Sequence, residues 1–157
     1  MRRVAIIGGG PAGLMAAEAL AATMEATAGP KGDALEVAIF DAMPSVGRKF
    51  LIAGKGGMNI THSEALSAFK ARYGLRETRL SPLLDSFGPE QLRTWIHGLG
   101  IETFVGTSGR VFPTEMKAAP LLRAWLHRLR ERGVHFHVRH RWLGWTKDGR
   151  LRFATPS

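Results

Sequence analysis

The sequence predicts an α/β fold, a Rossmann-like parallel sheet with flanking helices, followed by the start of an antiparallel β-meander. An apolar strand, a glycine turn, an alanine-rich helix and a second apolar strand follow one another within the first 41 residues. This βαβ order is typical of a parallel sheet covered by helices. Near the end of the chain, Asp148-Gly149 is a hairpin signal between two strand-like segments.

The composition is that of a folded domain. The chain has 157 residues, 45% of them hydrophobic, which is enough for one core and excludes a disordered chain. Because there is no cysteine, a disulfide scaffold, a thiolate metal site and a cysteine nucleophile are excluded. No stretch has the length of a membrane span or the form of a secretory signal, so we expect a cytoplasmic protein and no membrane partner.

The first elements follow from apolar runs and their boundaries. Val4–Ile7 reads as a short buried strand, and Pro11 suits the first turn of the helix that follows. Glycine and proline mark a loop over residues 27–34, and the second strand ends at Asp41.

The middle of the chain predicts a helix, a second helix and two strands. Thr61 with Glu64 three residues later forms a capping box, so we expect a helix from Thr61 toward Tyr73. Pro89 opens the next helix, and residues 101–113 read as two short strands around a glycine turn.

The last third predicts one long helix and a change to strands. The helix is expected to begin after Ala119 and to stop at Gly133, and residues 134–138 alternate as in a strand. Since only two or three parallel strands are accounted for, we expect the N-terminal part of a longer protein.

The strongest functional motif is the glycine turn "GGGPAG". Gly8, Gly10 and Gly13 satisfy G-x-G-x-x-G, with Pro11 and Ala12 between them. Gly8 permits the tight turn, Gly10 lets a pyrophosphate approach the backbone, and Gly13 lets the helix pack on the sheet. The start of the helix then faces the phosphates.

Asp41 stands where an acidic side chain can accept hydrogen bonds from a ribose. A carboxylate there disfavours a 2′-phosphate, which favours NAD or FAD over NADP. The alternative for an acidic residue at a strand end is simple solvation.

The glycine-rich stretch 47–62 follows. Gly47, Arg48 and Lys49 can reach a second side of a dinucleotide, and the glycines at 54, 56 and 57 leave space for a flat ring near the backbone. The alternative is a tight loop packed on protein.

Three segments, "VAIIGGGPAGLMAA", "GRKFLIAGKGGMNITH" and "GRVFPTEMKAAPLL", resemble the bacterial NAD(FAD)-utilising dehydrogenases, an aminoacetone-oxidase-like or bile-acid-reductase-like group of the glutathione-reductase-like superfamily. The resemblance runs from Arg3 to about Trp145. It implies an extended FAD with its flavin along the 47–62 stretch. Met58 stands where many relatives have cysteine.

The resemblance assigns a set of cofactor-binding residues. The pyrophosphate is expected at Gly10, Pro11, Ala12 and Gly13, and the adenosine ribose at Asp41, with further contacts from Arg48 and Lys49. The flavin is expected near Gly54, Lys55, Gly56, Gly57 and Asn59, and the adenine at the backbone near Trp142. The cofactor-binding set also includes Gly8, Ala42 and Gly47. No metal site is expected and no catalytic residue is assigned.

The resemblance also implies a function. We expect an FAD-dependent oxidoreductase, or its cofactor-binding part, acting on an unidentified small molecule with NAD(P)H as a candidate electron donor. Family members are longer, with an inserted domain and a returning C-terminal segment. Residues 1–157 are therefore expected to be the N-terminal portion of a single FAD-binding domain, which pairs with that segment or self-associates.

Two other functions stay open. The glycine motif and Asp41 would serve a flavin-free NAD-binding dehydrogenase equally well, but such an enzyme does not need the 47–62 stretch. A net charge of +9 and a pI near 11.0 leave open the hypothesis of an RNA-binding or RNA-modification module. A nucleic-acid partner is not expected, because the arginines gather on one amphipathic helix, where a solvated face explains them. An inactive fragment that aggregates through its sheet edge is a third outcome.

Overall fold

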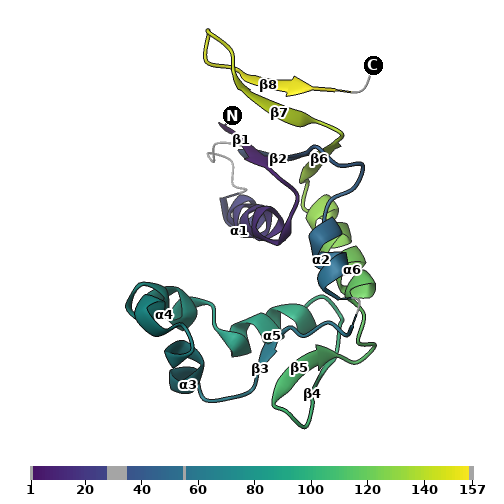
Figure 1. Cartoon of the computed structure of the whole chain (residues 1–157). Helices are drawn as coiled ribbons and strands as arrows, with labels where there is room; N and C mark the ends of the chain where they lie inside the picture. The colour runs from purple at the N-terminus through teal and green to yellow at the C-terminus, as the bar shows by residue number, and fades with distance from the viewer. Residues whose placement is uncertain (1, 28–34, 55, 156–157) are drawn as a thin grey trace. The chain divides into compact units, whose positions relative to one another are not determined.

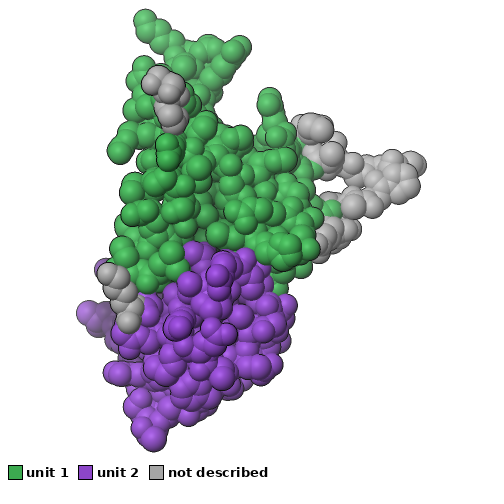
Figure 2. Space-filling model, turned by 90° about the vertical axis from the view of Figure 1, so that its right-hand side faces the viewer, with its two compact units in different colours: residues 1–52, 125–157 green, residues 53–124 purple. Residues whose placement is uncertain are grey.

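The computed structural model describes the chain except residues 1, 28–34, 55 and 156–157. Contacts within the chain divide it into two compact units (Figure 2). Unit 1 comprises residues 1–52 and 125–157, and unit 2 comprises residues 53–124. That residues 1–157 belong to a single FAD-binding domain stays a prediction.

Unit 1 is built on a three-stranded parallel sheet, as the sequence predicts. Its strands are β1 (Arg2–Ile7), β2 (Leu35–Asp41) and β6 (His135–Val138), in the order β1-β2-β6. Val4 pairs with Val37, and Ile39 pairs with Phe136. The parallel pairing brings the carboxyl ends of β1, β2 and β6 to one edge, where ligands bind in such folds.

Two helices and a hairpin cover this sheet. Helix α1 (Pro11–Thr27) packs on one face, and the hairpin lies over the other (Figure 1). The second half of α6 (Ala118–Glu131) contributes Trp125 and Leu129 to the buried core. Alanines of α1 allow close approach, and the fully buried side chains of this unit include Leu14, Ala17, Ala21, Val37, Ile39 and Leu129.

The hairpin of β7 (Arg141–Trp145) and β8 (Leu151–Ala154) confirms the predicted antiparallel strands. The register shifts between Trp142 and Gly144, and Gly144 has a φ of 104°, which suits a bulge. The hairpin therefore twists over the sheet while Trp142 stays paired with Phe153.

Unit 2 combines a small antiparallel sheet with short helices. The sheet has the order β3-β5-β4. The strands and helices are β3 (Thr61–His62), β4 (Thr103–Val105), β5 (Arg110–Pro113), α3 (Leu66–Ala71), the 3₁₀ turn η1 (Gly74–Arg76), α4 (Glu77–Ser86) and α5 (Pro89–His97). The predicted strands around 101–113 and the helix opened by Pro89 are confirmed.

The predicted helix start at Thr61 is wrong. Thr61 is buried in β3 and pairs with Val111 of β5, and α3 begins only at Leu66. The backbone N–H of Glu64 donates to Nδ1 of His62 at 3.1 Å. The pairing with a strand far along the chain therefore overrides the local capping signal.

Other boundaries differ less. Helix α2 (Arg48–Ala53) opens the glycine-rich stretch and was not predicted, and α6 begins at Ala118, slightly before the predicted start. Residues 28–34 of the predicted loop lie outside the described residues. Among the described residues, no helix combines the length and hydropathy needed to cross a membrane.

Candidate functional site

A pocket in unit 1 gathers the glycine turn, the end of β2 and the start of α2. Its volume is about 280 Å³. The lining residues are Gly8, Gly9, Gly10, Asp41, Met43, Ser45, Gly47, Arg48 and Lys49. Six of them were predicted as cofactor-binding from the sequence: Gly8, Gly10, Asp41, Gly47, Arg48 and Lys49.

The glycine turn leaves an open approach at Gly8 and Gly10. Gly8 has a φ of 104°, and its N–H donates to the carbonyl of Phe40 at 2.8 Å. A Cβ on Gly13 would lie 1.9 Å from the carbonyl oxygen of Gly8, whereas a Cβ on Gly10 would meet nothing within 4 Å. The turn therefore offers the bare backbone surface that a pyrophosphate needs.

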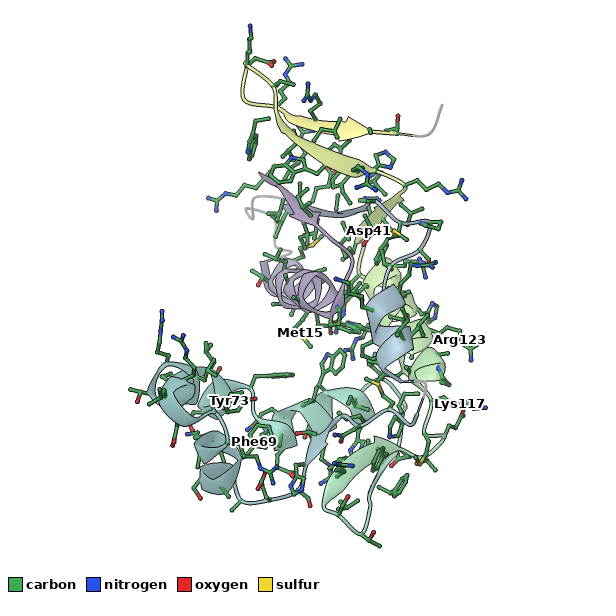
Figure 3. All side chains as sticks on the ribbon, viewed as in Figure 1. Met15, Asp41, Phe69, Tyr73, Lys117 and Arg123 are labelled. Atoms are coloured by element: carbon green, nitrogen blue, oxygen red, sulfur yellow. The ribbon has the colours of Figure 1, made fainter. Side chains whose placement is uncertain are left out.

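Asp41, at the end of β2 (Figure 3), organises the pocket with both carboxylate oxygens. Oδ2 accepts the N–H of Gly9 and Oδ1 accepts the N–H of Met43, both at 2.7 Å. Each oxygen keeps a further lone pair, which a ribose hydroxyl could use. Asp41 thus fixes the loop around it and still presents acceptors beside the glycine turn.

Gly9 was not predicted as a site residue. A Cβ there would lie 2.3 Å from Cγ1 of the buried Val46 and 3.1 Å from the Asp41 carboxylate. Its carbonyl accepts the N–H of Gly47 at 2.8 Å. The segment after β2 therefore folds tightly over the glycine turn, and the middle glycine of the run 8–10, which the G-x-G-x-x-G pattern does not require, was the sequence signal for this contact. Met43 and Ser45 line the pocket without any such signal.

Positive charge lines the same pocket. Arg48 and Lys49 are exposed at the start of α2. Helix α1 begins at Pro11 next to Gly10, with Ala12 and Gly13 in its first turn, where backbone N–H groups have no partner inside the helix. These donors and cations suit a diphosphate.

The glycines expected beside a flavin lie in unit 2. A Cβ on Gly54 would approach Cβ of Ala118 to 2.5 Å, and one on Gly57, whose φ is 110°, would approach Cε of Met116 to 2.9 Å. Both glycines therefore permit packing on protein, the alternative that the sequence left open. Gly56 has open space around it. Lys55 lies outside the described residues.

Two of the three motif segments pack together in unit 2. The N–H of Met58 donates to the carbonyl of Met116 at 3.0 Å, and the N–H of Ile60 donates to Val111 at 2.8 Å. Asn59 between them is exposed. That Gly54, Gly56, Gly57 and Asn59 contact a flavin stays a prediction.

The remaining predicted residues lie outside the pocket lining. Ala42 is exposed directly after β2. Trp142 is partly exposed on the hairpin and meets Trp145 edge-on, with ring centroids 6.4 Å apart. The expected adenine contact near Trp142 stays a prediction.

A family comparison matches this architecture. The model of the HI0933-like protein Rossmann domain matches residues 2–157. The chain belongs to this family. The resemblance predicted from the three motifs is thereby confirmed at the level of the family, and so is the Rossmann-like fold.

Two known proteins are similar to this family member. The chain is 31% identical over 138 residues to the 3-dehydro-bile acid delta(4,6)-reductase of Clostridium scindens, and the match covers 88% of the chain and 31% of that protein. The crystal structure of Thermovibrio ammonificans THI4 matches with a TM-score of 0.50 and 20% identity, over 97% of the chain and 45% of that structure. The chain therefore spans less than half the length of either protein, and the second likeness supports the fold.

Proposed function

We propose that this chain is the FAD-binding part of a flavin-dependent oxidoreductase. One observation carries the proposal: a single pocket joins an open glycine turn, a helix start, two cations and a carboxylate. The first three suit a pyrophosphate and the carboxylate suits an adenosine ribose.

Family membership and the reductase relative support the oxidoreductase class. The two alternatives, a flavin-free dehydrogenase and an RNA-binding module, are not favoured by either finding. Because the chain covers 31% of the reductase, the activity of the whole protein is part of the proposal.

The residues would hold FAD in two parts. Gly10 and the first turn of α1 would donate backbone N–H groups to the pyrophosphate, with Arg48 and Lys49 balancing its charge. Asp41 would accept from the ribose hydroxyls and repel a 2′-phosphate. A bound flavin supplies hydride-transfer chemistry. The electron donor proposed for the whole protein is NAD(P)H, its substrate is a small molecule, and its compartment is the cytoplasm.

The test is the visible absorption spectrum of the purified chain, recorded before and after adding FAD and desalting. We expect flavin bands that stay with the protein fraction. A Gly10→Ala variant is the matched control, because the added methyl group enters open space in the pocket. If the wild-type chain stays colourless, or if both proteins retain FAD equally, the proposal is contradicted.

A further inference from the structure

We propose that the turn between β6 and β7, residues 139–140, determines how specifically the pocket reads the ribose. The turn would act by holding the main chain of Asp41, so Arg139 and His140 are positioning residues rather than ligand contacts. The inference rests on the proposed function, because it concerns the adenosine half of the same site.

Two backbone hydrogen bonds connect the turn to the end of β2. The N–H of His140 donates to the carbonyl of Asp41 at 2.8 Å, and the N–H of Arg139 donates to the carbonyl of Met43 at 3.0 Å. On its other side, the Asp41 carboxylate accepts from Gly9 and Met43. The segment from Asp41 to Met43 is therefore held between the glycine turn and the β6–β7 turn.

The turn itself adopts an unusual backbone conformation. Arg139 has a φ of 59°, in the left-handed region that residues other than glycine rarely enter. Such a conformation persists only where its surroundings hold it. Here Nδ1–H of His140 donates to the carbonyl of Val138 at 2.8 Å, which closes a bond across Arg139.

The His140 ring is in turn held by aromatic neighbours. It meets Phe40 of β2 and Phe153 of β8 edge-on, with centroids 6.0 and 6.1 Å apart. Phe40 is stacked on Phe153 at 4.4 Å and on His137 at 4.6 Å. His140 therefore connects the ends of β2 and β6 to the hairpin, through its ring contacts and its hydrogen bond to Val138.

This arrangement separates two parts of binding. The glycine turn and the two cations would bind the phosphates, while Asp41 would bind the ribose hydroxyls. Groups that bind a ligand must be held within about 0.5 Å of the productive geometry. We expect loosening the turn to move Asp41 more than the phosphate-binding groups, because the turn is bonded directly to Asp41 and Met43 and reaches the glycine turn through the Asp41 carboxylate. Ribose reading should then weaken while phosphate binding persists.

The probes are ADP and 2′-deoxy-ADP, which differ by one ribose hydroxyl, titrated calorimetrically into the full chain. We expect the wild-type chain to prefer ADP by about tenfold, as for a hydrogen bond to a charged acceptor. The readout is the ratio of the two dissociation constants, because a general loss of structure weakens both ligands equally and leaves their ratio unchanged.

Four variants divide the turn into its parts. His140→Ala removes the ring bond to Val138, whereas His140→Asn places an amide donor where Nδ1 stands. Arg139→Pro removes the N–H that binds Met43 and fixes φ near about −65°, whereas Arg139→Gly keeps the N–H and accepts a positive φ. We expect His140→Ala and Arg139→Pro to lower the ratio to about threefold or less, and the other two to keep it near tenfold.

The outcomes separate the inference from the function on which it rests. A wild-type chain that binds neither nucleotide contradicts the proposed dinucleotide site itself, whereas one that binds both equally contradicts the ribose contact of Asp41 on which the inference rests. If the wild type discriminates and His140→Ala, shown by circular dichroism to be folded, discriminates equally well, the role of the turn is overturned. The same conclusion follows if His140→Ala weakens both nucleotides by the same factor.

Discussion

At the scale of residues, two glycines of one turn are needed for different reasons: Gly13 for close packing of the backbone and Gly10 for open space in the pocket. Gly13→Ala should destabilise the chain by about 2 kcal/mol or more, since its Cβ would lie 1.9 Å from the Gly8 carbonyl and the backbone must shift. Gly10→Ala should change stability by about 0.5 kcal/mol at most, because its Cβ meets nothing within 4 Å. Urea unfolding of both variants measures the difference. Equal losses of stability would show that the turn relaxes around either methyl group.

Asp41 should stabilise the pocket even without a ligand. Asp41→Asn places an amide group opposite one of the two N–H donors at 2.7 Å, so we expect a loss of about 1–3 kcal/mol. Ser45→Ala, on an exposed residue of the same lining, is the control and should change stability by about 0.5 kcal/mol or less. Thermal unfolding that is identical for Asp41→Asn and the wild type would argue against the two hydrogen bonds.

The spacing of the sequence was sufficient to bring Gly8, Gly10 and Asp41 together in one pocket lining, because their positions follow from a strand, a turn and a helix that are close in sequence. It was not sufficient to find Met43 and Ser45. They line the pocket only because the segment after β2 folds over the glycine turn, a path that no local pattern encodes.

At the scale of elements, one buried carboxylate joins α1 to α6 within unit 1. Glu18 is 7% exposed, and it accepts from Nε1 of Trp125 at 3.0 Å and from Arg132 at 2.9 Å. Arg128 adds an ion pair at 2.8 Å. Glu18 of α1 therefore connects the two helices through hydrogen bonds and an ion pair.

Removing this carboxylate takes away the acceptor that Trp125, Arg128 and Arg132 share. We expect Glu18→Ala to cost about 3 kcal/mol, the lower part of the range for buried pairs, because the arginines are partly exposed. Arg123→Ala, on an exposed part of the same helix, should change stability by about 0.5 kcal/mol or less. Urea unfolding measures the free energy of unfolding of the two variants. An equally small loss in both would show that Glu18 does not stabilise the contact between α1 and α6.

In unit 2, a glycine and a histidine fasten β3 to the β4–β5 turn. Nε2–H of His62 donates to the carbonyl of Ser108 at 3.0 Å, and a Cβ on Gly109 would lie 2.6 Å from the His62 ring. Gly109 also has a φ of 77°.

Gly100 offers a matched comparison, since its φ is 76° but a Cβ there meets nothing within 4 Å. We expect Gly100→Ala to cost about 1 kcal/mol, from backbone conformation alone. Gly109→Ala should cost about 2–3 kcal/mol because the clash adds to the same backbone cost. Thermal unfolding separates the two, and an equal cost would mean that the His62 ring moves aside freely.

The elements that could be predicted were those whose signals are local. Pro11 and Pro89 marked helix starts, and Asp148-Gly149 marked the hairpin, because each acts through its own backbone. Thr61 was misassigned because its partner, Val111, lies fifty residues further along the chain. Pairing at that distance supplies hydrogen bonds that a capping box cannot match.

At the scale of the whole molecule, the fold class followed from the order of elements. A strand, a helix and a second strand within one short segment admit few arrangements other than a parallel pair. The division into two units did not follow, because it depends on which distant segments contact one another. For the same reason, the expected site was divided: its phosphate and ribose residues lie in unit 1, and the glycines at 54–57 lie in unit 2.

The most direct test of the central claim is a calorimetric titration of FAD into the purified chain. The account predicts saturable binding of one FAD per chain, competition by ADP, and no measurable binding to Gly10→Ala, which should fold as the wild type does. Failure of the wild-type chain to bind FAD or ADP, or unchanged binding by Gly10→Ala, would contradict the assignment of this pocket to a dinucleotide.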